Sequence, residues 1–159
     1  LEADNIVVLD DNTEKSFFIS DKCEVVNGKT EEIEPGDVIR YATDENGEIS
    51  RIILYLHGKT GAVTGQNPSG DFISHFRTLY GTVSRKNDGI ILIKNDALTE
   101  AHLAQSFRIY SVDLSGRKPK VSVGSVSDIY SEEEKGSEAS RVFIQTRYGD
   151  PSTMIIYNN

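Results

Sequence analysis

Short runs of β-forming residues, separated by turn residues, recur along nearly the whole chain. The runs are rich in Val, Ile, Phe and Tyr, and they include NIVVLD, SFFIS, DVIRYA, SRIILYL, GIILI and TMIIY. Three of the separators are Asn27-Gly28, Asn46-Gly47 and Asp88-Gly89, dipeptides that supply the positive φ angles of tight hairpin turns. Strands joined by tight turns are antiparallel by geometry. The pattern therefore predicts an all-β fold of antiparallel strands.

One stretch, DALTEAHLAQSF, has the pattern of a helix instead. Asp96 can cap it, good helix formers follow, and Leu98, Ala101 and Gln105 lie near one face. We expect one short helix near residues 96–105.

The two halves of the chain resemble each other. SFFISD at 16–21 matches SFRIYS at 106–111, and residues 35–54 can be laid on residues 123–144 at an offset of 88 to 90. Upstream, NIVVLDDNTEKSFFI aligns with GIILIKNDALTEAHLAQSFRI if the second copy carries a six-residue insertion, where the helix is expected. We interpret this as two divergent tandem units, each a small antiparallel barrel or sandwich.

These copies predict the domain limits. A first unit spans 1–56, a Gly-rich linker 57–75, and a second unit 76–159. The second copy opens with LYGTVSRKNDG, a strand and hairpin, whereas the first has only LEAD in that place. We expect the first unit to lack its opening strand, which an upstream extension, another segment or another chain would supply. SRIILYL, apolar on both faces, is expected between the units or at the centre of one.

Charge and composition exclude several function classes. The 159 residues carry a net charge of -8, which disfavours nucleic acid and anionic lipid as partners. All of the excess lies in residues 1–79, which hold 15 acidic and 7 basic residues. The longest apolar runs are far shorter than the roughly 20 residues that cross a bilayer, so no membrane insertion is expected. The single cysteine, Cys23, excludes an internal disulfide.

Gly58-Lys59-Thr60 has the tripeptide that closes a phosphate-binding loop. Such a loop needs a glycine five positions before the Gly-Lys pair, where this chain has Ile53, and a helix directly after it. GAVTGQNPSG follows instead, and its glycines and proline forbid a helix. We therefore expect a surface linker and no nucleotide.

Two acidic stretches resemble cation sites only in composition. A calcium loop built on DENGE at 44–48 would place Ala42 first and Ile53 last, where carboxylates must stand. We interpret DENGE as a hairpin tip, and SEEEKGSE at 131–138 as a longer solvated turn with repelling charges. Calcium is possible at these acidic turns but is not predicted.

The remaining chemistry-bearing residues form no recognisable set. His57, His75 and His102 lack the spacing of a metal motif, and no Gly-x-Ser-x-Gly sequence is present. Paired carboxylates for a hydrolase stay open as the weakest class, since their separation is a property of the fold. We predict no catalytic, cofactor-binding or metal-binding residues, and no enzyme.

Basic residues cluster once, in SGRKPK, which contains Arg117, Lys118 and Lys120. The simplest interpretation is a solubilising turn. The alternative is contact between this turn and the acidic first half of another copy, a heterologous interface that propagates end to end.

EIEPGDVIRYATDENGEISRIIL, a strand followed by an Asn-Gly hairpin and a returning apolar strand, resembles β modules in large surface proteins of clostridial-type anaerobic bacteria. Such modules often accompany S-layer homology segments, and SRVFIQTRYGDPSTMIIYN resembles their closing part. The resemblance implies a non-catalytic extracellular module.

The sequence therefore favours a structural or protein-interaction module of a larger extracellular or cell-surface assembly, with other protein modules or copies of itself as partners. One alternative is a β module that binds carbohydrate or a small ligand, for which Tyr55, Tyr80, Tyr110 and Tyr130 would have to line one exposed surface. A virion structural component is another. The cytoplasm stays open as a location, because low cysteine use fits both settings.

Overall fold

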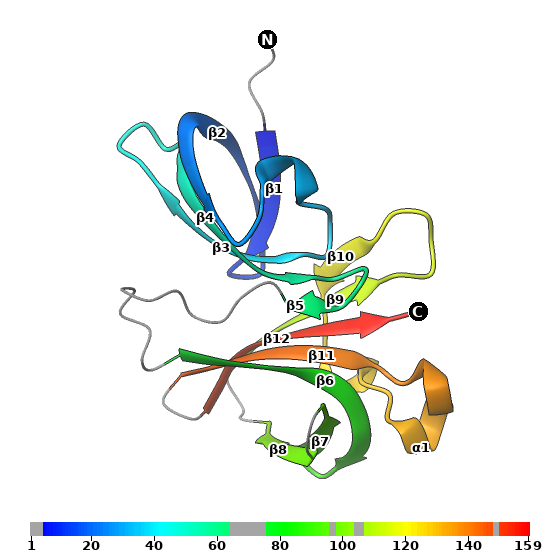
Figure 1. Cartoon of the computed structure of the whole chain (residues 1–159). Helices are drawn as coiled ribbons and strands as arrows, with labels where there is room; N and C mark the ends of the chain where they lie inside the picture. The colour runs from blue at the N-terminus through cyan, green and yellow to red at the C-terminus, as the bar shows by residue number, and fades with distance from the viewer. Residues whose placement is uncertain (1–4, 64–75, 96–97, 104–106, 148–149) are drawn as a thin grey trace. The chain divides into compact units, whose positions relative to one another are not determined.

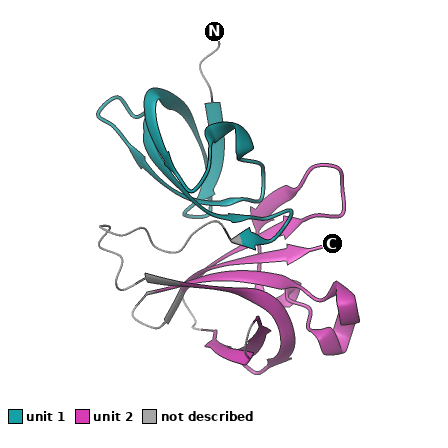
Figure 2. Cartoon of the chain, viewed as in Figure 1, with its two compact units in different colours: residues 1–66 teal, residues 67–159 magenta. Residues whose placement is uncertain are grey.

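The computed structural model of the protein describes residues 5–63, 76–95, 98–103, 107–147 and 150–159. The chain forms two compact units, residues 1–66 and 67–159, each built on one β-sheet (Figure 2). This confirms the expected all-β class and its division into two units.

The first unit contains one five-stranded sheet, in which β1, β2, β4 and β3 follow one another and β5 also pairs with β4. A short 3-10 turn over Thr30–Glu32 connects β2 to β3. The strands are β1 Asn5–Asp10, β2 Thr13–Val26, β3 Val38–Thr43, β4 Ile49–His57 and β5 Ala62–Val63.

The long strand β2 is shared between two neighbours. Its first part pairs antiparallel with β1, and residues 24–26 pair parallel with residues 51–53 of β4 after a shift in register beyond Ile19. Figure 1 shows β2 curving between these partners. β4 also pairs antiparallel with β3, so the SRIILYL run that it contains occupies the centre of its sheet, and six side chains of β4 are buried. They are Ile49, Ile52, Ile53, Leu54, Tyr55 and Leu56.

The second unit contains a seven-stranded sheet in the order β10, β9, β12, β11, β6, β7, β8. Its strands are β6 Phe76–Asn87, β7 Ile90–Lys94, β8 Leu98–His102, β9 Arg108–Asp113, β10 Lys120–Val123, β11 Arg141–Arg147 and β12 Asp150–Asn158. Between β10 and β11 lie 3-10 turns at Val126–Asp128 and Gly136–Glu138, with the short helix α1, Glu132–Lys135, between them.

The prediction of a helix near residues 96–105 is wrong. Residues 98–102 form strand β8, paired with β7 so that Ala101 lies opposite Ile91 in the core. Ala101 is buried while Leu98 and Glu100 are exposed, a period of two that suits a strand. Cross-strand pairing therefore overrides local helix propensity. Residues 96–97 and 104–106 lie outside the described residues, whose one α-helix is α1.

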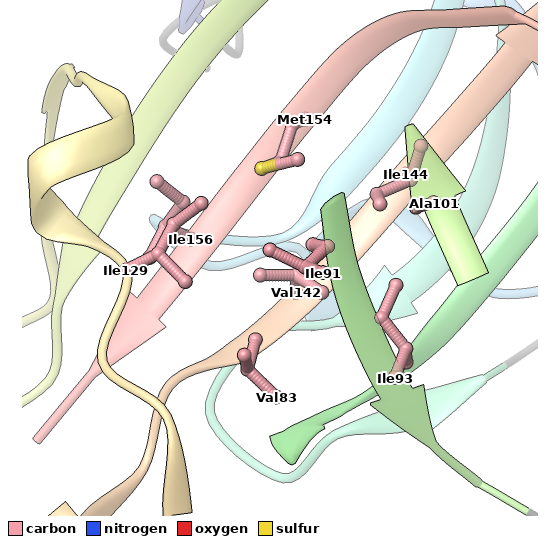
Figure 3. Close-up of a cluster of buried hydrophobic side chains, with 9 residues drawn as sticks. All are labelled: Val83, Ile91, Ile93, Ala101, Ile129, Val142, Ile144, Met154 and Ile156. Carbon is pink, nitrogen blue, oxygen red and sulfur yellow. The ribbon is translucent and has the colours of Figure 1, made fainter. Parts of the chain in front are cut away.

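The second unit contains a cluster of buried aliphatic side chains, which converge in Figure 3. Strands β6, β7, β8, β11 and β12 contribute to it, together with Ile129 from the end of a 3-10 turn. Its members are Val83, Ile91, Ile93, Ala101, Ile129, Val142, Ile144, Met154 and Ile156.

Neither sheet is purely antiparallel, which corrects the predicted pairing. β2 runs parallel to β4, and β9 runs parallel to β12. Asn46-Gly47 and Asp88-Gly89 do turn hairpins, with φ of 76° at Gly47 and 75° at Gly89. Asn27-Gly28 does not, because it leads from β2 into the 3-10 turn.

The units share a topology, but the predicted alignment of their later parts is wrong. In each, a strand is followed by a 3-10 turn and then by an antiparallel hairpin, whose second strand returns parallel to the first. β3 and β4 therefore correspond to β11 and β12, so residues 35–54 do not correspond to 123–144. The second unit has β10 and α1 inserted before its hairpin, and this insertion displaced the sequence alignment.

The linker expected over residues 57–75 begins later in the chain than residue 57. His57 ends β4, and residues 62–63 form β5, which pairs with β4. Residues 57–63 therefore belong to the first unit, and 64–75 lie outside the described residues.

Removing core volume from the second unit should destabilise it strongly. We expect Ile144→Ala to lower the free energy of unfolding by about 2–5 kcal/mol, because the cavity adds to the lost burial. Urea unfolding followed by circular dichroism checks this. Val121→Ala, on the exposed strand β10, should cost less than about 1 kcal/mol. Equal losses in the two variants would contradict the core assignment.

Candidate functional site

Each of the two histidines that the structure describes lies beside one acidic side chain of its own unit. His57 Nδ1 lies 3.4 Å from Asp37 Oδ2, whereas His102 in the second unit lies 3.7 Å from Glu100 Oε2 on an exposed strand. His75 lies outside the described residues. Within the described ranges, no group of three or more His, Cys, Asp or Glu side chains could hold a metal ion.

The Gly58-Lys59-Thr60 tripeptide is part of a turn held by a buried carboxylate. Asp37, whose side chain is 2% exposed, accepts hydrogen bonds from the backbone N–H groups of Gly58 at 3.0 Å and Glu34 at 2.9 Å. A phosphate loop would direct such N–H groups at its ligand. Here the Gly58 donor serves the protein, and the turn leads into β5 rather than into a helix.

Most of the acidic stretch 131–138 is exposed, as a solvated turn would be, but three of its four glutamates lie beside bases, so the expectation that its charges only repel is corrected. Glu132, Glu133 and Glu134 lie in helix α1, and each lies within 4 Å of a base on β6 or β7. The pairs are Glu132 with Lys94 at 3.9 Å, Glu133 with Arg85 at 3.0 Å and Glu134 with Lys86 at 3.7 Å. The backbone N–H of Ser131 donates to Glu134 and lowers its pKa. These contacts locate the helix instead of leaving repelling charges.

The other acidic turn, residues 44–48, is a hairpin tip, as the sequence indicates. Asp44 Oδ1 accepts hydrogen bonds from the backbone N–H groups of Asn46 at 2.9 Å and Glu48 at 3.0 Å. The Gly47 N–H donates to the Asp44 carbonyl. The carboxylate of Asp44 is thus committed to turn geometry.

A buried polar network in the second unit is structural. Ser140 is fully buried, its hydroxyl accepts a hydrogen bond from the Tyr130 N–H at 2.8 Å, and it also contacts Asn158. Asn158 Nδ2 donates to the Asp128 carbonyl at 2.8 Å. The network ties the segment between β10 and β11 to the end of β12.

The four tyrosines that a sugar platform would need do not form one. Tyr55 and Tyr110 are buried, at 2% and 6% exposure. Tyr80 accepts a hydrogen bond from Arg141, and Lys135 Nζ lies 4.9 Å from the ring centre of Tyr130. Sugar-binding modules present flat exposed rings, an arrangement these residues do not provide.

The second unit does present an exposed strand at one end of its sheet. Among the described strands β10 pairs only with β9, and all four of its residues are exposed. Val121 and Val123 are 37% and 54% exposed, and Val126 just beyond the strand is 39% exposed. Val121 and Val123 lie on one face, because side chains alternate along a strand.

The backbone N–H and C=O groups of these two valines also point away from the neighbouring strand β9. The Gly124 N–H donates to the Ile109 carbonyl at 2.9 Å, and Val123 lies opposite Tyr110. Hydrogen-bonded and non-hydrogen-bonded pairs alternate in an antiparallel ladder. The N–H and C=O groups of Val121 and Val123 therefore point away from β9.

The basic turn lies directly before this strand. Arg117, Lys118 and Lys120 are exposed, and the turn begins where Ser115 donates to Asp113 through its hydroxyl at 2.6 Å and its N–H at 2.9 Å. These hydrogen bonds, that of the hydroxyl first, lower the pKa of Asp113. Three cations thus border the two exposed valines. No sequence signal indicated that both faces of β10 would be exposed.

The first unit has its own end strands, β1 and β3, which side chains connect. Tyr41 on β3 donates to Asp10 Oδ2 on β1 at 2.6 Å, and the rings of Tyr41 and Phe17 lie 5.3 Å apart. Burial, followed by the hydrogen bond to Asp10, raises the pKa of Tyr41 well above its usual value.

No protein family model, curated protein or solved structure matches this chain. Among the described residues, no helix has the length and apolar character needed to cross a membrane.

The carboxylate of Asp37 should stabilise the turn that follows β4 in the first unit. We expect Asp37→Ala to lower the free energy of unfolding of the first unit by about 1–3 kcal/mol, because the backbone N–H groups of Glu34 and Gly58 lose their acceptor. Urea unfolding measures the loss. The control is Asp21→Ala, at an exposed position of β2, which should change stability by less than about 0.5 kcal/mol.

Tyr41 should make the first unit sensitive to alkaline pH. Its pKa is raised on folding, so its contribution is complete below the unfolded tyrosine pKa of about 10 and declines as pH rises toward the folded value. Denaturant midpoints between about pH 9 and pH 12 should therefore fall more steeply in the wild type than in Tyr41→Phe. Parallel decline of the two proteins would show that this hydroxyl does not contribute.

Proposed function

We propose that the protein is a non-catalytic structural or protein-interaction module of a larger extracellular or surface assembly, and that its copies associate end to end. The observation that carries the proposal is strand β10, which presents two exposed valines and outward-directed backbone groups beside a basic turn. Strands of this kind recruit further strands from other chains.

The charge distribution supports a contact between unlike ends. Residues 1–66 hold 14 acidic and 6 basic residues, a net charge of -8, whereas residues 67–159 hold 11 of each. Arg117, Lys118 and Lys120 therefore complement the first unit of another copy. Since the two surfaces differ, the contact is heterologous and continues from copy to copy.

The remaining support concerns chemistry and setting. In the parts of the chain that the structure describes, the carboxylates of Asp37 and Asp44 and the hydroxyl of Ser140 are engaged in holding turns and loops. The resemblance of residues 32–54 to modules of bacterial surface proteins supports the extracellular setting.

Sedimentation velocity at rising protein concentration tests the association. We expect larger species at about 0.01 M salt and loss of these species at about 1 M, where charges are screened beyond about 3 Å. Val123→Pro should weaken association about tenfold or more, because it removes an outward N–H without breaking a bond to β9.

Val126→Ala is the matched control, since it removes apolar surface just outside the strand, and it should change association less than about threefold. Reversing Arg117 and Lys118 to Glu should abolish the salt dependence. A wild-type monomer at every salt and protein concentration would contradict the proposal.

A further inference from the structure

Strand β6 has a position in the second unit that has no described counterpart in the first. It is long and bent (Figure 1), and it pairs antiparallel with β11 through residues 76–82 and with β7 through residues 82–87. Thr82 pairs with both neighbours, Arg141 and Lys94. β6 thus bridges the hairpin β11–β12 to the hairpin β7–β8.

Among the described strands, the first unit has the corresponding hairpins but no strand that bridges them. β3–β4 corresponds to β11–β12, and β1 with the first part of β2 corresponds to β7–β8. Among the described strands, β3 pairs only with β4 and β1 only with β2. Tracing the pairings through β2 and β4 shows that β1 and β3 run in the same direction, as β7 and β11 do, so one strand can be antiparallel to both.

The contact between β1 and β3 is made by side chains and not by backbone pairing. Tyr41 reaches Asp10 from the face where its ring meets Phe17. Ile6 and Val8 on β1 share that face with Asp10 and are less exposed than their neighbour Val7, so it is the inner face of the sheet. This contact holds the two strands near each other and leaves their ladders unpaired with one another.

The acidic charge of the first unit indicates which kind of strand could add between β1 and β3. Asp10, Asp11, Asp44 and Glu45 lie at the ends of β1 and β3, within a unit of net charge -8. The β6 segment, FRTLYGTVSRKN, carries Arg77, Arg85 and Lys86 and no acidic residue. An added strand of this composition would be electrostatically complementary to the first unit.

We propose that the first unit binds an extended cationic segment of another polypeptide between β1 and β3, where it adds as a strand antiparallel to both. Backbone pairing supplies affinity, as in other cases of strand addition, and basic side chains supply selectivity. The site is separate from β10 and does not depend on its association.

A labelled peptide tests the site in the full chain. The probe is a fluorescein-labelled peptide with the sequence of residues 76–87, and fluorescence anisotropy follows its binding to dilute protein. We expect saturable binding that weakens about tenfold or more at about 1 M salt. Hydrogen exchange should show new protection in residues 5–10 and 38–43 only.

Matched variants separate pairing from charge. A peptide with proline in place of Thr82 should bind about tenfold or more weakly, because it lacks a central backbone donor. A peptide with Arg77, Arg85 and Lys86 replaced by Glu should also fail. In the protein, Glu45→Lys should weaken binding, whereas Glu138→Lys, at an exposed position of the second unit, should not.

Three results would overturn the proposal. They are the absence of saturable binding, protection in β8 or β10 in place of β1 and β3, and protection of β1 and β3 on concentrating the protein alone. The last would identify a second copy as the occupant. Failure of the peptide to bind leaves the association through β10 intact, since Val123→Pro tests that strand independently.

Discussion

Backbone hydrogen bonding to one central strand organises each unit. β4 and β12 each lie between a parallel strand that precedes them in the chain and the antiparallel partner of their own hairpin. Because these strands are paired on both sides, their apolar side chains can be buried, as Ile52 and Leu54 are in β4 and Met154 and Ile156 in β12. The remaining strands extend these triplets outward until a strand is left with one partner, and those end strands are where the chain can meet other chains.

Much of this could be predicted from local sequence. Short runs of β-forming residues identified most strands, and Asn46-Gly47 and Asp88-Gly89 identified two hairpins, since a positive φ at glycine is a local property. The parallel pairs could not be predicted, because they join residues such as Val25 and Ile52 across an intervening turn and hairpin strand. The helix expected near residues 96–105 rests on the local preference of Ala101 and its neighbours, whereas pairing with β7 decides the structure of residues 98–102.

Some features of the candidate site could likewise be predicted from local sequence, whereas others depend on the fold. Spacing alone was sufficient to reject Gly58-Lys59-Thr60 as a phosphate loop, and the structure supplies the reason, a turn that satisfies Asp37. The glutamates of α1 were expected to repel one another, because their partners Arg85, Lys86 and Lys94 lie more than 35 positions earlier and meet them only through the fold. Exposure of Val121 and Val123 is likewise a property of strand order, and composition does not reveal it.

The shared topology of the two units, with its parallel pairs, is the basis for comparing them and for locating the gap between β1 and β3. Backbone nuclear Overhauser effects in the isotopically labelled full chain test it most directly. We expect contacts typical of parallel strands between Val25 and Ile52 and between Ile109 and Met154. Antiparallel contacts at either pair, or contacts from β3 to a strand other than β4, would contradict the account.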